Sequence, residues 1–524
     1  MSPHAPAYQR LPTDIDGLDL LLDGGLRFPA SGSIFMVILG GPGSGKTHLA
    51  LELAVRTLNR IDSGSGEGGC HVFYSLDQSP AELHAKLRED FDMYGMQGDW
   101  RRIVGSLQSD DHAAQIHEFT PQSNRERYLL LASLREPPRD LVTRSATLFE
   151  RLDGDIAAIT RGGASLGTKL TPKLVAIDNI SINAFEDGAH ARAALHAIRQ
   201  HLAARRLHGI FVFETPGGSS DRATFTAAEY AADVIINLGY HEVADQFKER
   251  QIEIAKARHQ FYFRGTHHFS IVGRNEGELR GGRGKRPPGL HVYPSVPTLL
   301  SHLGYRAAPK NAGQTVRFGV ADLTIPAGSV SGLVGPPLRA TTAHRLALEF
   351  LLAEEGDGLL VSFRENGHEH LDAAPRGLTP AQRQRLHVLA FAPEYLSAGK
   401  FLKDVYDEIE ELRRGGRRIC RAALWGLGHL KMAFPLLNES RMLLPWMSAF
   451  FKQQGISSLF VEAANAVHRD GTVSGDSSVP SSVDHLLFLV DEPSGRLELQ
   501  LVRSLSANSA KHGRNIPVPP ELAH

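Results

Sequence analysis

The chain has few cysteines, almost no net charge and no long apolar run. Its 524 residues include two cysteines, Cys70 and Cys420, which cannot form a disulfide framework and lack the paired spacing of metal ligands. The 57 basic and 58 acidic residues argue against a broadly basic surface for duplex DNA. No run approaches the roughly 20 apolar residues of a membrane span, and no secretory signal pattern opens the sequence. These absences predict a cytoplasmic protein without a membrane anchor.

A glycine-rich segment near the start of the chain has the pattern of a P-loop. Residues 40–47 read GGPGSGKT, which fits GxxxxGK[ST]. The apolar run 34–39 predicts a strand before it, and the apolar spacing of residues 48–58 predicts a helix after it. In such a loop the backbone N–H groups face phosphates, the lysine reaches the terminal phosphates and the threonine hydroxyl binds magnesium. The residues predicted to bind nucleotide are Gly40, Gly41, Pro42, Gly43, Ser44, Gly45, Lys46, Thr47 and His48.

An imperfect copy of this loop occurs in the second half of the chain. Residues 335–342 read GPPLRATT, so Ala340 and Thr341 replace the Gly-Lys pair. Loss of the lysine ammonium removes the charge that holds the terminal phosphates. The sequence therefore predicts one active and one degenerate nucleotide site.

Predicted strands and helices alternate along both halves of the chain. This pattern indicates an α/β fold with two tandem P-loop domains, each a mainly parallel sheet flanked by helices. Residues 280–289 (RGGRGKRPPG) have the composition of a linker. The expected division is a first domain at 1–279 with an insertion within about 106–171, a linker at 280–289, a second domain at 290–506 and a mobile tail at 507–524.

Two aspartates follow predicted strands and have the chemistry that a triphosphate site needs. Asp178 ends the strand KLVAID and is expected to hold magnesium through a water molecule, together with Thr47. Asp77 ends CHVFYSLD and is the candidate base for the attacking water. An alternative role for Asp77 is helix capping, but Ser79 can cap the following helix and leave Asp77 available.

Four ordered segments, TDIDGLDLLLDGGL, SLDQSP, AIDN and EIAKARH, together resemble the RecA superfamily, and most of all the tandem-domain KaiC proteins. The resemblance extends over nearly the whole chain and implies two RecA-like domains. It also implies ATP as the nucleotide, with Mg²⁺, and a homo-oligomeric ring, by family expectation a hexamer. Lys256 and Arg258 fill the Lys-x-Arg pattern that, in this family, reaches the γ-phosphate bound by the neighbouring subunit and stabilises its charge.

The sequence departs from the family pattern at the catalytic pair. The resemblance implies two adjacent glutamates after the second strand, of which the first activates water, but here the pair is Asp77-Gln78. Aspartate keeps the carboxylate and withdraws it by about 1.5 Å. We therefore expect slow hydrolysis of ATP.

The second half lacks most of the corresponding groups. By spacing, Thr341 takes the place of the P-loop lysine, Gly426 that of the magnesium aspartate and Arg364 that of the base. Arg503 persists at the arginine of the Lys-x-Arg pair, while Leu501 replaces its lysine. We therefore expect a pseudo-ATPase domain that acts as a scaffold or as a platform for protein partners.

Two glutamates have the same spacing in both halves. Glu214 lies 36 residues after Asp178, and Glu462 lies 36 residues after Gly426. The equal spacing predicts that the two glutamates are equivalent. Because they occur in both halves, we interpret them as structural or interface groups and not as the base.

Three functional hypotheses follow. The leading one is a slow, ring-forming KaiC-like ATPase whose chemistry resides in the first domain. It includes no autokinase activity at Ser481 or Ser482, because nothing in the second half holds magnesium triphosphate against them. A DNA-acting recombinase or helicase relative is an alternative, which the neutral charge balance disfavours. A nucleotide-gated switch or assembly protein that does not hydrolyse ATP is the third.

Overall fold

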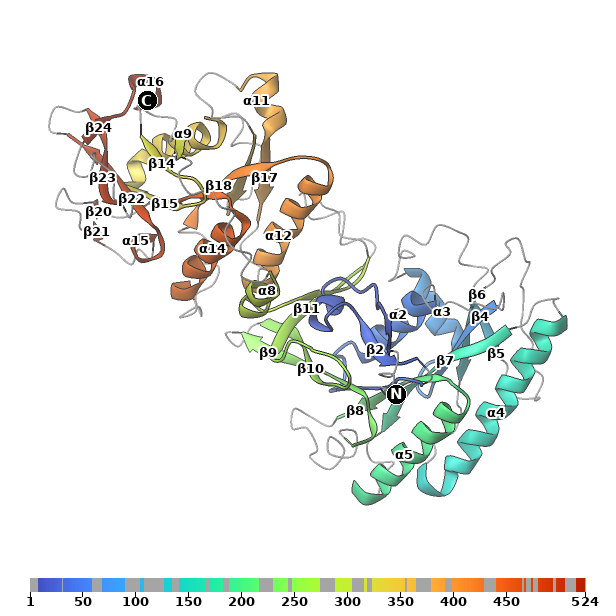
Figure 1. The fold of residues 1–524 in the computed structure, drawn as a ribbon. Helices are drawn as coiled ribbons and strands as arrows, with labels where there is room; N and C mark the ends of the chain where they lie inside the picture. The colour runs from blue at the N-terminus through green and yellow to red at the C-terminus, as the bar shows by residue number, and fades with distance from the viewer. Residues whose placement is uncertain are drawn as a thin grey trace, which may run out of the picture. The chain divides into compact units, whose positions relative to one another are not determined.

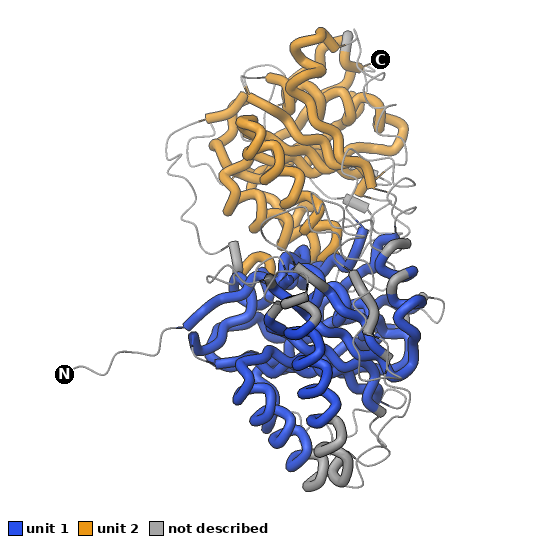
Figure 2. Tube along the Cα trace, turned by 90° about the vertical axis from the view of Figure 1, so that its right-hand side faces the viewer, with its two compact units in different colours: residues 1–281, 285–295 blue, residues 282–284, 296–524 orange. Residues whose placement is uncertain are grey.

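The structure is a computed structural model of the chain, which divides into two compact units (Figure 2). The first comprises residues 1–281 and 285–295, and the second comprises residues 282–284 and 296–524. The structure describes residues 8–30, 32–58, 68–89, 104–107, 127–133, 141–165, 170–181, 188–215, 230–243, 247–273, 288–303, 315–317, 323–353, 356–363, 378–391, 398–427, 440–463, 466–467, 473–474, 479–492, 496–504 and 515–523.

The first unit is built on one large sheet. In its described part, ten strands follow the order β12-β11-β10-β9-β3-β8-β7-β4-β6-β5. Neighbours from β5 to β9 are parallel, and β10, β11 and β12 continue the sheet antiparallel. The strands are β3 (Phe35–Gly40), β4 (Gly68–Ser75), β5 (Val104–Leu107), β6 (Arg127–Ser133), β7 (Leu170–Ser181), β8 (His208–Glu214), β9 (Val234–Val243), β10 (Phe247–Ala257), β11 (Thr266–Val272) and β12 (Gly289–Tyr293).

Helices cover both faces of this sheet (Figure 1). Buried residues of α2 (Lys46–Leu58) and α3 (Pro80–Glu89) belong to the apolar cluster of one face. Those of α4 (Leu141–Ser165) and α5 (Gly188–Ala204) belong to the cluster of the other face. The central strand FMVILG is buried along its whole length, as expected for a parallel strand covered on both sides. The short elements β1 (Tyr8–Leu11), α1 (Leu18–Leu21) and β2 (Leu26–Pro29) complete the unit.

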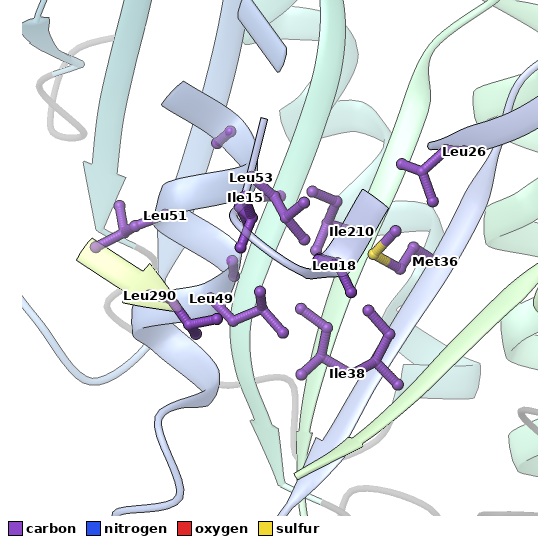
Figure 3. Close-up of a cluster of buried hydrophobic side chains, with 14 of the residues drawn as sticks. Ile15, Leu18, Leu26, Met36, Ile38, Leu49, Leu51, Leu53, Ile210 and Leu290 are labelled. Atoms are coloured by element: carbon purple, nitrogen blue, oxygen red, sulfur yellow. The ribbon is translucent and has the colours of Figure 1, made fainter. Parts of the chain in front are cut away.

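Strand β12 ties a distant segment to the P-loop helix. Figure 3 shows Leu290 of β12 beside Leu49 of α2, in the same apolar cluster. The Leu290 N–H donates to Glu52 Oε2 of α2 at 2.8 Å. The first unit therefore extends beyond the boundary expected at residue 279, because β12 completes its sheet. The linker expected at 280–289 lies outside the described residues except for its last two, of which Gly289 begins β12.

The second unit repeats this plan with a smaller sheet. In its described part, eight strands follow the order β17-β16-β18-β19-β15-β22-β23-β24, parallel from β17 to β22 and antiparallel beyond. The strands are β15 (Val330–Gly335), β16 (Asp357–Ser362), β17 (Leu386–Ala390), β18 (Ile419–Trp425), β19 (Ser457–Ala463), β22 (His485–Asp491), β23 (Leu497–Ser504) and β24 (Asn515–Pro517). Two strand pairs lie apart, β13 (Thr315–Arg317) with β14 (Thr324–Pro326) and β20 (Ala466–Val467) with β21 (Val473–Ser474).

The helices of the second unit also pack against its sheet. Helix α9 contacts β16, β18 and β19. Helices α12 and α14 both contact α8; α12 also contacts β18, and α14 also contacts β15 and β19. The helices are α8 (Val296–Leu303), η4 (Pro337–Arg339), α9 (Ala340–Leu352), α11 (Pro380–Arg385), α12 (Ala398–Arg414), α14 (Ser440–Gln454), α15 (Val479–Ser482) and α16 (Pro520–Ala523). The predicted fold class, two α/β domains with mainly parallel sheets, is confirmed.

Two further expectations about chain organisation concern residues that the structure describes in part. The tail expected at 507–524 is wrong for residues 515–523, because β24 pairs with β23 and Ile516, Val518 and Leu522 are buried in the core. Within the insertion expected at 106–171, the described residues form β6, α4 and parts of β5 and β7. In the described part of the chain, no helix is long and apolar enough to cross a membrane.

Candidate nucleotide and magnesium site

The loop between β3 and α2 has the backbone of a phosphate cradle. Gly43 and Gly45 have φ angles of 72° and 97°. Residues with a side chain rarely adopt this left-handed region, so the two glycines are what permits the tight path of the loop. The loop leads directly into the N-terminus of α2, where free N–H groups and the helix dipole favour an anion.

Lys46 lies almost buried at the start of α2. Its Nζ donates to the Gly41 carbonyl at 2.8 Å, across the loop. Burial lowers the pKa of Lys46, whereas the nearby carboxylates of Glu214, Asp178 and Asp77 act to raise it. The Gly41 carbonyl therefore holds the ammonium over the loop, and the three carboxylates favour its charged form.

Asp178 and Thr47 form the candidate magnesium site. The Thr47 hydroxyl donates to Asp178 Oδ2 at 2.8 Å. Asp178 is 1% exposed, and its Oδ1 has no hydrogen-bond partner among the described residues. Burial raises the pKa of Asp178 to about 6, against the hydrogen bond from Thr47. Hydroxyl and carboxylate oxygens are the ligands that Mg²⁺ prefers, and an unpartnered buried oxygen fits a metal-bound water.

Asn179 joins two further carboxylates at this edge of the sheet. Its Nδ2 donates to Asp77 Oδ2 at 2.6 Å and to Glu214 Oε2 at 2.8 Å. Asp77 follows β4, Asn179 lies in β7 and Glu214 ends β8, opposite Gly40 of β3. The carboxyl ends of parallel strands meet at one edge, which is where open α/β sheets bind ligands. Sequence reasoning missed Asn179, whose only signal was its place next to Asp178.

Asp77 is free of the capping role that was its alternative. Ser79 and Glu82 form the capping box of α3, in which the Ser79 hydroxyl and N–H both donate to Glu82 Oε2, at 2.8 and 2.7 Å. The Glu82 N–H donates back to Ser79 Oγ at 3.3 Å. The prediction that Ser79 caps the helix is confirmed, and the exposed Asp77 carboxylate faces Asn179 instead.

Two further residues, His48 and Tyr240, lie next to the loop. His48 was assigned to the nucleotide, but its ring is buried 4.0 Å from Glu52 Oε2, and burial lowers its pKa to about 3. Only the main chain of His48 is therefore suited to a phosphate. Tyr240 of β9, which the sequence gave no reason to select, donates its hydroxyl to the Gly43 carbonyl and lies 41% exposed beside the loop.

Lys256 and Arg258 do not join this cluster within the chain. Ala257 pairs with Val234 at the start of β9, whereas Gly40 pairs with Leu238 further along the same strand. Four residues at roughly 3.3 Å each put about 13 Å between these two edges. At the far edge, Arg258 donates to the Tyr230 carbonyl at 2.8 Å and lies 3.6 Å from Asp233.

Comparison with known protein families agrees with this geometry. The family model of the ATPase KaiC matches residues 11–277, just over half of the 524 residues. The chain belongs to the KaiC family of ATPases. The matched range contains the loop, Asp77, Asp178, Lys256 and Arg258, so the resemblance inferred from sequence is confirmed. A search of the curated proteins found no match.

The corresponding loop of the second unit does not form such a cradle. Pro336 and Pro337 have no N–H to offer a phosphate. Residues 335–342 are all described, and none has a positive φ; Ala340, in the place of Gly45, is helical at φ −57°. A 3₁₀ turn, η4, replaces the loop, and its Leu338 is 96% exposed.

Strand pairing corrects the position of the lost magnesium aspartate. In the first unit Asp178 pairs with Ser75, the last residue of β4. In the second, Trp425 pairs with Ser362, the last residue of β16. The next residue of each strand confirms the match, because the Leu76 N–H donates to the Asp178 carbonyl and the Phe363 N–H donates to the Trp425 carbonyl. Trp425 therefore takes the place of Asp178, and the assignment of Gly426 was wrong by one residue. Neither Trp425 nor Gly426 has a carboxylate. The predicted base position, Arg364, lies outside the described residues.

The same ladders separate the two glutamates that have equal spacing. Glu214 pairs with Gly40, but Gly335, which corresponds to Gly40, pairs with Ala463. Glu462 pairs with Val334 instead. A shift of one residue turns a side chain to the opposite face of a sheet. The predicted equivalence of Glu214 and Glu462 is therefore wrong.

Arg503 also changes its counterpart. Lys256 pairs with Ile235 just after a bulge in β10, and Arg503 pairs with Leu486 just after the matching bulge in β23. Arg503 therefore corresponds to Lys256 and not to Arg258. Its guanidinium donates to main-chain carbonyls of its own unit, among them that of Val483 at 2.6 Å.

Proposed function

We propose that this chain is a ring-forming ATPase that hydrolyses ATP slowly, with the chemistry in the first unit. One observation carries the proposal. Lys46, Asp77 and Asp178 gather at the carboxyl edge of the sheet, while Lys256 and Arg258 lie at its opposite edge. A cation at the far edge can meet a γ-phosphate only at the loop of another copy. A repeated head-to-tail contact of this kind closes a ring, for which we propose six subunits.

The reaction that we propose uses the groups as follows. The loop N–H groups and Lys46 hold the β- and γ-phosphates, while Thr47 and Asp178 would hold Mg²⁺, which neutralises phosphate charge when bound. Asp77 accepts a proton as the water oxygen attacks the γ-phosphorus and the bond to the bridging oxygen breaks. Lys256 and Arg258 of the neighbouring copy stabilise the charge on the transferred phosphoryl oxygens.

In the second unit we propose a scaffold or a platform for protein partners, without autokinase activity. The absence of the lysine, the magnesium aspartate and the left-handed glycines supports this role. Ser482 is 8% exposed within α15, so it is also poorly accessible. Phosphate on Ser481 or Ser482 after incubation of the pure protein with ATP would contradict the proposal.

Two measurements test the proposal together. The particle mass is determined with and without ATP and magnesium, and phosphate release is measured for the wild type, Lys46→Ala and Asp77→Asn. We expect a ring that forms with ATP. We also expect slow phosphate release by the wild type, which both variants abolish. A monomer under all conditions would remove the trans mechanism. If the wild type released phosphate no faster than Asp77→Asn, the protein would instead be a nucleotide-gated switch that does not hydrolyse ATP.

A further inference from the structure

A short segment of the chain closes the degenerate site of the second unit. After β24, which extends the sheet beside β23, residues 518–523 turn toward α9, and α16 packs against that helix (Figure 1). Ile516, Val518 and Leu522 are buried in the same apolar cluster as Ala343 of α9. The segment 515–523 is therefore part of the core and not a surface appendage.

The segment meets the remnant of the magnesium site. Thr342 corresponds to Thr47, whose hydroxyl donates to the magnesium aspartate in the first unit. In the second unit the Thr342 hydroxyl donates to the carbonyl of Ala523, at a long 3.4 Å, and is 3% exposed. Ala523 and Ala340 pack on the same cluster. A main-chain carbonyl of the segment thus takes the bond that a carboxylate has in the active site.

The position that corresponds to Asp178 carries a buried apolar side chain. Trp425, which replaces Asp178 in the ladder, is 7% exposed and lies in the cluster with Ala343 and Leu522. Its ring is 4.9 Å from that of His344 on α9, centroid to centroid. An indole has no oxygen with which to bind Mg²⁺.

We propose that the degenerate nucleotide site is a peptide-binding site whose ligand is the chain's own segment 515–523. The segment supplies the apolar contacts and the acceptor at Thr342, and so stabilises the second unit in the place where a nucleotide stabilises the first. The second unit binds this segment and not ATP. The proposal is independent of whether the first unit hydrolyses ATP.

Full-length variants test the proposal by thermal unfolding. A Trp100→Phe background leaves only Trp425 and Trp446, so tryptophan fluorescence reports on the second unit. Leu522→Asp puts a charge on a buried side chain and is expected to lower the unfolding temperature by roughly 5 °C or more. Asn515→Asp adds the same charge at an exposed position of the segment and is the matched control. Equal unfolding temperatures for the two variants would overturn the proposal.

Two additions separate the peptide from the nucleotide. Magnesium ATP, added in a Lys46→Ala background that removes binding by the first unit, should leave the tryptophan transition unchanged; an increase would overturn the proposal. A synthetic peptide of residues 512–524, added to the Leu522→Asp variant, should restore the transition in a saturable manner. A peptide that carries the same Leu522→Asp change should not, and equal rescue by both peptides would contradict a specific site.

Discussion

The side-chain amide of Asn179 lies 2.6 Å from Asp77 Oδ2, so the candidate base is held by the residue that follows Asp178, the candidate magnesium ligand. The same nitrogen donates to Glu214 at 2.8 Å, which fixes it between two strands. The Asn179 side chain, which belongs to β7, thus links Asp77 after β4 with Glu214 at the end of β8.

Replacement of Asn179 by alanine should slow hydrolysis without loss of ATP binding. A hydrogen bond to a charged group contributes about 1.5–3 kcal/mol, so we expect kcat to fall roughly 10-fold or more as Asp77 loses its orientation. Phosphate release at saturating ATP measures kcat, and a fluorescent ATP analogue measures affinity. Asn515→Ala, at an exposed position of the second unit, is the control. An unchanged kcat would show that the contact does not position Asp77 for catalysis.

The length of the base can be tested at Asp77 itself. Asp77→Glu restores the methylene that the resemblance implies, and because about 1 Å of displacement can cost up to 100-fold in rate, we expect kcat to rise about 10-fold. Asp77→Asn should remove most of the activity, since general-base catalysis contributes about 10²–10⁴-fold. Phosphate release is compared with that of Asp23→Asn, which alters an exposed ion pair with Arg10. A glutamate variant slower than the wild type would contradict the distance argument.

Sequence reasoning predicted the fold correctly, and it selected the candidate residues of the first site, from local signals. The loop, the buried strand before it and Asp178 at the end of KLVAID are short patterns whose chemistry follows from their order. It did not find Asn179 or Tyr240, because an amide or a phenol has no motif and acquires its role only through a neighbouring strand.

Correspondence between the two halves was harder to predict. Equal spacing of 36 residues paired Glu214 with Glu462, although the strand ladders differ by one residue. Between the positions that the ladders match, Asp178 to Glu214 is 36 residues (214 − 178) and Trp425 to Ala463 is 38 (463 − 425), so the equal count arose from an error of one residue at each end. Only hydrogen-bonded pairing fixes which residue faces the site. The buried segment 515–523 was missed for a related reason, since its three prolines beside short apolar residues have the composition of a tail.

Magnesium-dependent binding of ATP should weaken in mild acid. The pKa of Asp178 is raised to about 6, chiefly by burial, so a proton competes with the metal below that pH. We expect the apparent magnesium affinity to fall up to about 10-fold per pH unit below 6 and to be nearly constant above 7. Magnesium titrations at fixed ATP from pH 5 to 8 measure this dependence, and chelation of the metal should weaken ATP binding at every pH. Asp178→Asn should bind weakly at all pH values; a slope that persists in this variant would assign the titration to another group.

Stability of the first unit should decrease as Glu52 ionises. Burial raises its pKa from 4.5 to about 7, against the pull of Arg56. Between these values the folded chain keeps a proton that the unfolded chain has released, so stability falls as pH rises through this window and levels off above 7. The shift of about 2.5 units corresponds to at most about 3 kcal/mol. Glu52→Gln should flatten the difference in urea unfolding between pH 5 and 8 and keep an acceptor for the Leu290 N–H. A parallel pH dependence in the variant would contradict this origin.

The trans role of Arg258 can be isolated by mixing two inactive variants. Asp77→Asn keeps ATP binding and Arg258 but lacks the candidate base, whereas Arg258→Ala keeps the base and lacks the cation, whose loss costs about 10³–10⁵-fold in comparable enzymes. In a ring assembled with ATP from equal amounts, a quarter of the interfaces (1/2 × 1/2) join an intact Asp77 to an intact Arg258, so phosphate release should return to about one quarter of the wild-type rate. A mixture of Arg258→Ala with the Asp77→Asn/Arg258→Ala double variant has no such interface and should remain inactive. Recovery in both mixtures, or in neither, would mean that Arg258 does not act across the interface.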